Sequence, residues 1–131
     1  MNLNRRAIGL ALVCAGLLGA FSAQALTIKA FSQAELMAVQ SAGNSVALHF
    51  RADWCPTCRA QDKAIETFKN DPALDKVTLL VVDYDNSKAL RKAMGVAGQS
   101  TIVVFKGKNE VTRSAGDTDA IALKALLLKS L

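Results

Sequence analysis

The segment Trp54-Cys55-Pro56-Thr57-Cys58 limits what this chain can fold into, because two different structural patterns meet there. The apolar run Val46 to Phe50 before it is typical of a strand, and the residues from Cys58 to Asn70 show helical periodicity. Pro56 suits the first position of that helix, since its φ is already helical and the N–H that it lacks would have no partner. The sequence therefore predicts a strand that leads through two cysteines directly into a helix.

Two thiols at a helix N-terminus indicate redox chemistry. The unpaired N–H groups of the first turn and the positive end of the helix dipole favour a thiolate. Cysteines three residues apart lie on one face of a helix, within reach of a disulfide. The alternative is a permanent disulfide or an inert pair, but a disulfide that closes so short a loop removes little entropy from the unfolded chain. We therefore expect Cys55 and Cys58 to be redox-active.

Residues 1–25 have the pattern of a secretory signal peptide. Arg5 and Arg6 form a short basic region, and Ala7 to Phe21 is an apolar run too short for a comfortable membrane span. Small residues occupy the positions that a signal peptidase reads in Ala23-Gln24-Ala25. Two other export signals fit less well. The residues beside the arginine pair do not match the twin-arginine motif. A lipoprotein signal has a small residue just before its cysteine, and the cysteine in this leader has none.

Cleavage after Ala25 would leave a domain of residues 26–131 outside the cytoplasm, in the periplasm. Removal of the leader lowers the formal net charge from +5 to +3. The remaining Lys and Arg residues are scattered and have no aromatic residues among them, which argues against a nucleic-acid partner. The mature length has room for one domain.

Strand and helix patterns alternate along the mature chain. Both faces of the strand at 45–51 are largely apolar, which predicts a central strand with helices on either side. The order indicates an α/β fold with a mixed central β-sheet and helices on both faces. The expected strands are 26–31, 45–51, 77–82, 101–105 and 110–114, and the expected helices are 32–42, 58–70, 87–94 and a last one capped by Asp117 or Thr118. The last helix is expected to point Ile121, Leu123, Ala125, Leu126 and Leu128 inward.

The residues around the cysteines resemble the active-site segment of the thioredoxin family. The matching run is Phe50-Arg51-Ala52-Asp53-Trp54-Cys55-Pro56-Thr57-Cys58-Arg59, and Val103 to Gly107 followed by Gly116 is similar to the last two strands of the family. The resemblance spans the mature chain. It implies a thioredoxin fold and a thiol–disulfide oxidoreductase whose only cofactor is its own redox-active disulfide. Similarity to branches that deliver electrons outside the cytoplasm favours a reductant, supplied by a membrane electron donor.

The resemblance also assigns roles at the site. Cys55 is the expected nucleophile and Cys58 the expected resolving thiol, which attacks the mixed disulfide and releases the partner. The partners are expected to be protein thiols and disulfides. Trp54 is expected to shield the site with its ring. Contacts with the partner are expected from the residues beside the cysteines and from the loop that faces them, namely Trp54, Pro56, Thr57, Gln99, Ser100 and Thr101.

His49 lies six residues before Cys55, on the strand that enters the site. In the thioredoxin family this position often holds a buried acid that assists proton transfer at the resolving cysteine. An imidazole could do the same with a pKa closer to neutral. The alternative is a core histidine that hydrogen-bonds to the backbone.

Ser100 stands where the thioredoxin family carries a cis-proline that faces the cysteines. A cis bond before a residue other than proline costs about 3 kcal/mol, so we expect a trans Gln99–Ser100 peptide or a reshaped loop. Serine also brings back a backbone N–H and adds a hydroxyl beside the thiols. The alternative is a neutral change in a loop that still pairs with an extended partner peptide.

Metal binding is the competing function. A zinc site needs four ligands, and the only cysteines and histidine of the mature chain are Cys55, Cys58 and His49. Haem attachment is disfavoured because Arg59, not histidine, follows the second cysteine. We expect no resident metal, and the alternative is a binding module that holds a metal ion or cluster through the cysteine pair, shared between two chains.

Overall fold

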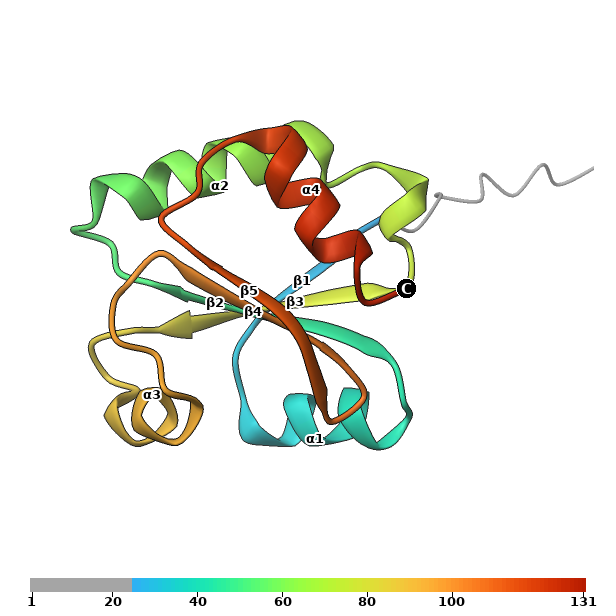
Figure 1. The fold of residues 1–131 in the computed structure, drawn as a ribbon, viewed down its shortest axis with the longest axis horizontal. Coiled ribbons are helices and arrows are strands. Elements are labelled where there is room, and N and C mark those ends of the chain that lie inside the picture. Colours follow the sequence, from blue (N-terminus) through green and yellow to red (C-terminus); the bar gives the residue numbers. More distant parts are fainter. Residues whose placement is uncertain (1–24) are drawn as a thin grey trace, which may run out of the picture.

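The computed structural model describes residues 25–131, which form a five-stranded sheet with helices packed on it (Figure 1). The strands are β1 (Thr27–Ala30), β2 (Ser45–Arg51), β3 (Val77–Asp83), β4 (Thr101–Lys106) and β5 (Asn109–Ala115). The helices are α1 (Gln33–Ser41), α2 (Pro56–Phe68), the 3₁₀ turn η1 (Pro72–Leu74), α3 (Lys88–Met94) and α4 (Ala120–Leu128). None of these helices has the length and apolar character that a bilayer crossing needs. The predicted signal peptide falls on residues that lie, apart from Ala25, outside the described part of the chain.

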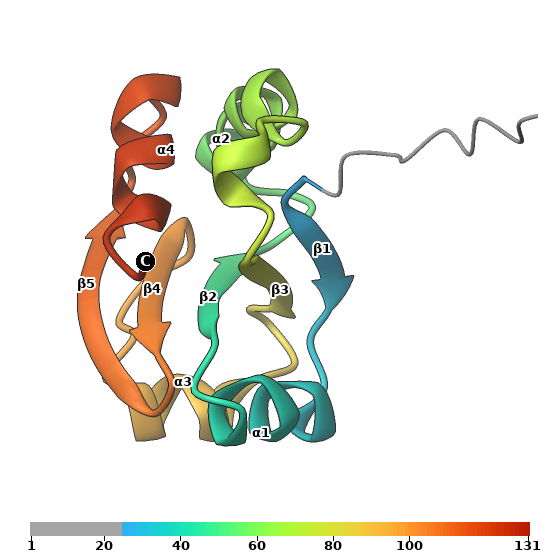
Figure 2. The same ribbon diagram turned by 90° about the vertical axis from the view of Figure 1, so that its right-hand side faces the viewer.

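The strand order is β1-β3-β2-β4-β5, so β2 lies in the middle of the sheet. It runs parallel to β3 and antiparallel to β4. At the edges, β1 is parallel to β3 and β5 is antiparallel to β4. Helices α2 and α4 cover one face of the sheet, and α1 and α3 cover the other (Figures 1 and 2). The predicted α/β fold, with a mixed sheet between two helical layers, is confirmed.

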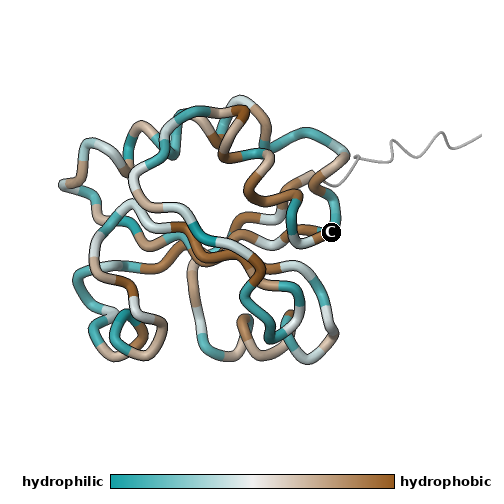
Figure 3. Tube along the Cα trace, viewed as in Figure 1, coloured by the Kyte–Doolittle hydropathy of each residue, from teal (hydrophilic) through white to brown (hydrophobic). Residues whose placement is uncertain are grey.

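The core lies on both faces of β2, as its two apolar faces predict. Val46, Leu48 and Phe50 are buried in the cluster under α1 and α3, and Ala47 is buried in the cluster under α2 and α4. Burial of a large apolar side chain such as Phe50 stabilises the fold by about 2 to 3 kcal/mol. The most hydrophobic stretches of the chain accordingly lie in the central strands, whereas the outer loops are more hydrophilic (Figure 3). This packing holds the carboxyl end of β2, from which the cysteine segment continues, in a fixed place.

The last helix differs from the prediction at its start and on its inner face. Its cap is Asp119, whose carboxylate accepts the N–H of Ala122 at 2.8 Å, rather than Asp117 or Thr118. Leu123, Leu126 and Leu127 face inward, because residues three and four apart share one side of a helix. Ile121 lies off this stripe and is 81% exposed, so its predicted inward position is wrong; Ala125, also expected inward, is exposed as well.

Candidate active site

The dithiol sits where α2 begins, at the carboxyl end of β2. Cys55 is the N-cap of α2, and its Sγ accepts the backbone N–H of Cys58 at 3.1 Å. The sulfur here accepts the backbone hydrogen bond that a serine or aspartate oxygen commonly accepts at a helix start. Pro56 occupies the first turn, as predicted. The local sequence therefore places one sulfur among the unpaired N–H groups of the helix, where negative charge is favoured.

Both thiols are buried, with exposed fractions of 1% for Cys55 and 0% for Cys58, and no disulfide joins them in this structure. They pack with Ala52 and the ring of Tyr84 in a small apolar cluster. Burial of this kind disfavours a thiolate unless nearby donors stabilise it. The hydrogen bonds around each sulfur therefore decide which thiol ionises first.

Ser100 supplies one such donor from the loop that faces the helix. Its hydroxyl oxygen lies 3.2 Å from the Sγ of Cys55 and 3.1 Å from the Sγ of Cys58. The described part of the chain contains no cis peptide bond, so the predicted trans Gln99–Ser100 peptide is confirmed. The N–H that a proline would lack donates to the backbone oxygen of Phe50 at 2.8 Å. Serine at this position thus fixes the loop to β2 and brings a hydroxyl to both sulfurs.

The two cysteines have opposite pKa shifts. Burial acts to raise the pKa of Cys55, but hydrogen bonds from the Cys58 thiol, the Ser100 hydroxyl and the backbone outweigh burial and bring this pKa below its ordinary value of 9.0. The pKa of Cys58 is raised, because burial and its hydrogen bond to Cys55 both favour the neutral thiol. A thiolate at Cys55 beside a neutral thiol at Cys58 is the state that the expected nucleophile and resolving roles require.

His49 joins a buried network through a residue that the sequence analysis did not single out, Gln61. The His49 ring Nε2 lies 2.9 Å from Oε1 of Gln61. The Gln61 amide nitrogen donates to the backbone oxygens of Ser100 at 3.0 Å and Asp117 at 2.8 Å. Because both amide hydrogens are used, Oε1 is the acceptor and His49 carries its proton on Nε2. The other ring nitrogen, Nδ1, then faces a carboxylate oxygen of Asp62 at 3.9 Å.

The network bears on both expectations for His49. His49 is buried in the core, as the alternative expected, but its hydrogen-bond partner is the Gln61 side chain rather than the backbone. Gln61, 0% exposed, connects His49 to the Ser100 loop, and within residues 25–131 the imidazole forms no hydrogen bond to either sulfur. Proton transfer by His49 therefore stays a prediction. The sequence feature that could have indicated a buried position for Gln61 is its place three residues after Cys58, on the same helical face as Ala64 and Ile65.

The buried imidazole should make the folding stability depend on pH. Desolvation lowers the pKa of His49 from 6.5, against the opposing effects of Gln61 and Asp62. The unfolded chain therefore takes up a proton first as the pH falls below 6.5, and stability is lost by up to about 1.4 kcal/mol per pH unit. Denaturant unfolding of the oxidised protein, in which neither Cys55 nor Cys58 titrates, measures this slope.

A His49→Gln variant provides the control for this slope, because its side chain does not titrate. The slope just below pH 6.5 should flatten in the variant. Carboxylates whose charged form is stabilised by the fold change the folding stability only at lower pH, since the pKa values of Asp71, Asp83 and Glu110 are lowered from 3.8, 3.8 and 4.5. An equal slope in both proteins would assign the effect to other groups.

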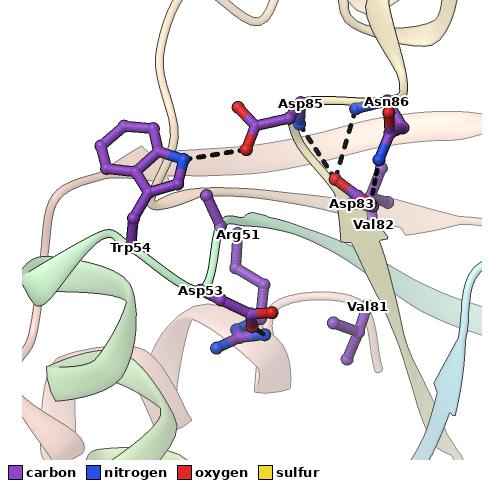
Figure 4. A pocket seen from close by; sticks show the side chains of 9 residues that line it. Arg51, Asp53, Trp54, Val81, Val82, Asp83, Asp85 and Asn86 are labelled. Atoms are coloured by element: carbon purple, nitrogen blue, oxygen red, sulfur yellow. Dashed lines mark hydrogen bonds and ion pairs between the residues drawn. The ribbon is translucent and has the colours of Figure 1, made fainter.

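A cavity of about 450 Å³ lies beside Trp54 (Figure 4). Trp54 is 58% exposed, and its indole Nε1–H donates to the carboxylate of Asp85 at 2.8 Å. Arg51 points into the same region and forms ion pairs with Asp53 at 2.8 Å and Asp62 at 3.1 Å. The exposed indole is thus tied to the loop after β3, and a polar surface with an excess of carboxylates adjoins the buried thiols.

The other residues expected to contact a partner lie around the dithiol with different exposures. Pro56 is exposed, Thr57 and Gln99 are half-buried, and Thr101 is buried. The Thr101 hydroxyl donates to the backbone oxygen of Gly98 at 2.8 Å, so it folds the loop and does not point to the sulfurs. Of the side chains of loop residues 99–101, that of Ser100 is the one within hydrogen-bond distance of the cysteine sulfurs.

A dithiol that caps a helix next to the central strand of a mixed sheet defines a thioredoxin-type site. The family model Thioredoxin matches residues 24–129. A thioredoxin from Chlamydia trachomatis is 33% identical over 88 residues, which are 67% of this chain and 84% of that protein. The chain belongs to the thioredoxin family.

Two further relatives extend the comparison. The crystal structure of Trxlp from Edwardsiella tarda has a TM-score of 0.74 and 31% sequence identity, and the match covers 77% of this chain and 98% of that one. The protein disulfide-isomerase erp38 of Neurospora crassa is 35% identical over 74 residues, which are 55% of this chain and 20% of that longer protein. The chain is therefore similar in fold to Trxlp and similar in sequence to part of a protein named as a disulfide isomerase.

Proposed function

We propose that this protein is an exported thiol–disulfide oxidoreductase that reduces disulfides of partner proteins in the periplasm. The observation that carries the proposal is the pair of unequal thiols. Cys55 Sγ accepts the Cys58 N–H and contacts the Ser100 hydroxyl, whereas Cys58 is buried and has a raised pKa. Such an arrangement supports attack by one sulfur and resolution by the other.

The exchange proceeds in two steps. The Cys55 thiolate attacks one sulfur of the partner disulfide, so a Cys55–partner disulfide forms and the other partner sulfur leaves as a thiolate. Cys58 then loses its proton and attacks the Cys55 sulfur, which forms the Cys55–Cys58 disulfide and releases the second partner thiolate. Two electrons pass from the dithiol to the partner, and the two released thiolates take up the proton from Cys58 and one proton from the solvent, which had received the proton of Cys55.

The direction of exchange rests on the resemblance to electron-delivering branches of the family. Hydrogen bonds to the Cys55 thiolate favour an oxidant instead, because they stabilise the reduced form and so raise the reduction potential. A reductant in an oxidising compartment therefore needs a donor that returns two electrons to the disulfide after each turnover. A membrane protein with an exposed dithiol has the required chemistry.

The competing function, a metal or cluster module, would need ligands beyond one chain. Among residues 25–131, no group of three His, Cys, Asp or Glu side chains lies close enough together to hold a metal ion. Cys55 and Cys58 of two chains would have to meet, and both thiols are buried. The structure offers no specific observation in favour of this function.

Reduction of insulin disulfides, followed together with the equilibrium potential against glutathione, tests the proposal. We expect turnover and a potential below that of the compartment's thiol pool. No exchange in either direction, with stoichiometric metal in anaerobically purified protein, would support the binding module instead. Cell fractionation with mass measurement tests export separately, because the periplasmic form should begin at residue 26.

A further inference from the structure

The Ser100 hydroxyl occupies an unusual place between the two sulfurs. It lies 3.2 Å from one and 3.1 Å from the other, and within residues 25–131 the sulfurs are its hydrogen-bond partners. A hydroxyl carries one hydrogen, which rotates about the C–O bond to whichever neighbour accepts it best. At nearly equal distances, rotation alone redirects the donor from Cys55 to Cys58.

The backbone holds this hydroxyl in place from both sides. The Ser100 N–H donates to Phe50 at 2.8 Å, and the Ser100 carbonyl accepts the N–H of Gly116 at 2.9 Å and the Gln61 amide at 3.0 Å. These bonds hold Ser100 at a φ of +62°, in the left-handed region that L side chains rarely adopt. Glycine would take this conformation without strain but has no hydroxyl, whereas serine here places a hydroxyl oxygen within 3.2 Å of both sulfurs.

We propose that the Ser100 hydroxyl is a catalytic hydrogen-bond donor that serves the two sulfurs in turn, first the Cys55 thiolate and then the Cys58 thiolate. The inference deepens the proposed function and rests on it. Ser100 is a catalytic residue in this proposal because its oxygen touches both reacting atoms.

The first role is in the reduced protein. The Cys55 thiolate accepts hydrogen bonds from the Cys58 N–H and from the Ser100 hydroxyl, and such charge-assisted bonds are stronger than neutral ones. Since Cys55 is 1% exposed, water contributes little to this stabilisation. Loss of the hydroxyl therefore reduces the thiolate fraction available for attack on a partner disulfide.

The second role follows formation of the mixed disulfide. The Cys55 sulfur is then neutral and a weak acceptor, so the hydroxyl hydrogen turns to Cys58 Sγ, 3.1 Å away. Cys58 has the greater need of a donor, because burial raises its pKa and it must lose a proton before it attacks. The same hydroxyl therefore stabilises the thiolate that forms the Cys55–Cys58 bond and breaks the bond to the partner.

The hydroxyl also affects the redox equilibrium. Neither sulfur is charged in the Cys55–Cys58 disulfide, so the hydroxyl stabilises the reduced form more than the oxidised one. Stabilising the reduced form raises the reduction potential. Removal of the hydroxyl should therefore make the protein a stronger reductant at equilibrium and a slower one in turnover.

Ser100→Ala and Ser100→Gly test the proposal together, because both remove the hydroxyl and only glycine relieves the backbone strain. In both variants we expect the acid dissociation constant of Cys55, followed by thiolate ultraviolet absorbance, to fall about tenfold, which is one pKa unit. A tenfold change in the redox equilibrium lowers the potential by about 30 mV. Single-turnover release of a partner from its mixed disulfide should slow by about tenfold as well.

Ser114→Ala is the matched control, since it removes a half-buried hydroxyl from strand β5, whereas the hydroxyl found hydrogen-bonded to the two sulfurs within residues 25–131 is that of Ser100. It should titrate and release partners as the unaltered protein does. If Ser100→Ala and Ser100→Gly also behave like the unaltered protein, the proposed role of the Ser100 hydroxyl is wrong. The proposed oxidoreductase function would still stand in that case, provided that the unaltered protein turns over. A changed pKa with unchanged release would overturn the second role. Absence of turnover in the unaltered protein would instead count against the proposed function.

Discussion

Replacement of Cys58 by serine is expected to leave the protein covalently joined to its partners. Cys55 keeps the Ser100 hydroxyl and the backbone N–H of residue 58 as donors, because the substitution does not remove either group. It can still attack a partner disulfide, but no second thiol remains to resolve the product. Mixed disulfides should accumulate on non-reducing gels and identify the physiological partners by mass spectrometry.

Replacement of Cys55 by serine should have the opposite result, with no covalent complexes and turnover reduced to the uncatalysed rate. Cys58 is 0% exposed and its pKa is raised, so it is a poor first nucleophile. The double variant, Cys55→Ser with Cys58→Ser, controls for complexes that form through other groups. Complexes on Cys55→Ser but not on Cys58→Ser would show that the two roles are reversed.

Much of the fold could be predicted because its signals are local. The alternation of Val46, Leu48 and Phe50 with Ala47 identified a strand with two apolar faces, and that strand is the centre of the sheet. The hydroxyl of Ser32 accepts the N–H of Glu35 at the start of α1, and serine followed three residues later by glutamate is a local signal for a helix start. These patterns depend on neighbours within one turn or one strand, so a sequence displays them directly.

The last helix shows where local signals are insufficient. Asp117, Thr118 and Asp119 are all suitable caps, and a shift of one or two residues in the start of a helix is not visible in composition. The structure selects Asp119, whose carboxylate accepts the N–H of Ala122. The inward stripe through Leu123 and Leu127 then follows from helical spacing, which leaves Ile121 in solvent.

The site was predicted in part. Its two cysteines, the helix start and the presence of a hydroxyl at Ser100 follow from sequence and from the resemblance. The link through Gln61 does not, because its partners lie 39 residues away at Ser100 and 56 residues away at Asp117. Only the folded sheet brings these three segments together, and a glutamine on an otherwise apolar helix face carries no mark of its partners.

Removal of the Gln61 side chain is therefore expected to have a large effect. In a Gln61→Ala variant, the His49 Nε2–H loses its acceptor and the Asp117 carbonyl loses its donor. The Ser100 carbonyl loses one of its two hydrogen-bond donors. Each buried group left without a partner costs about 1 to 3 kcal/mol. We expect the free energy of unfolding to fall by about 3 kcal/mol, measured by denaturant titration of the oxidised protein.

A Lys63→Ala variant is the matched control, because Lys63 lies on the exposed face of the same helix and should change stability by less than about 0.5 kcal/mol. Gln61→Glu separates hydrogen bonding from volume, since a carboxylate can accept from His49 but cannot donate to the carbonyls of Ser100 and Asp117. It should destabilise the fold strongly at neutral pH and less at acidic pH, where a protonated carboxyl regains one donor. Equal stability of Gln61→Ala and Lys63→Ala would mean that water or rearrangement replaces the network, and the Ser100 loop would then be held by its bonds to Phe50 and Gly116 alone.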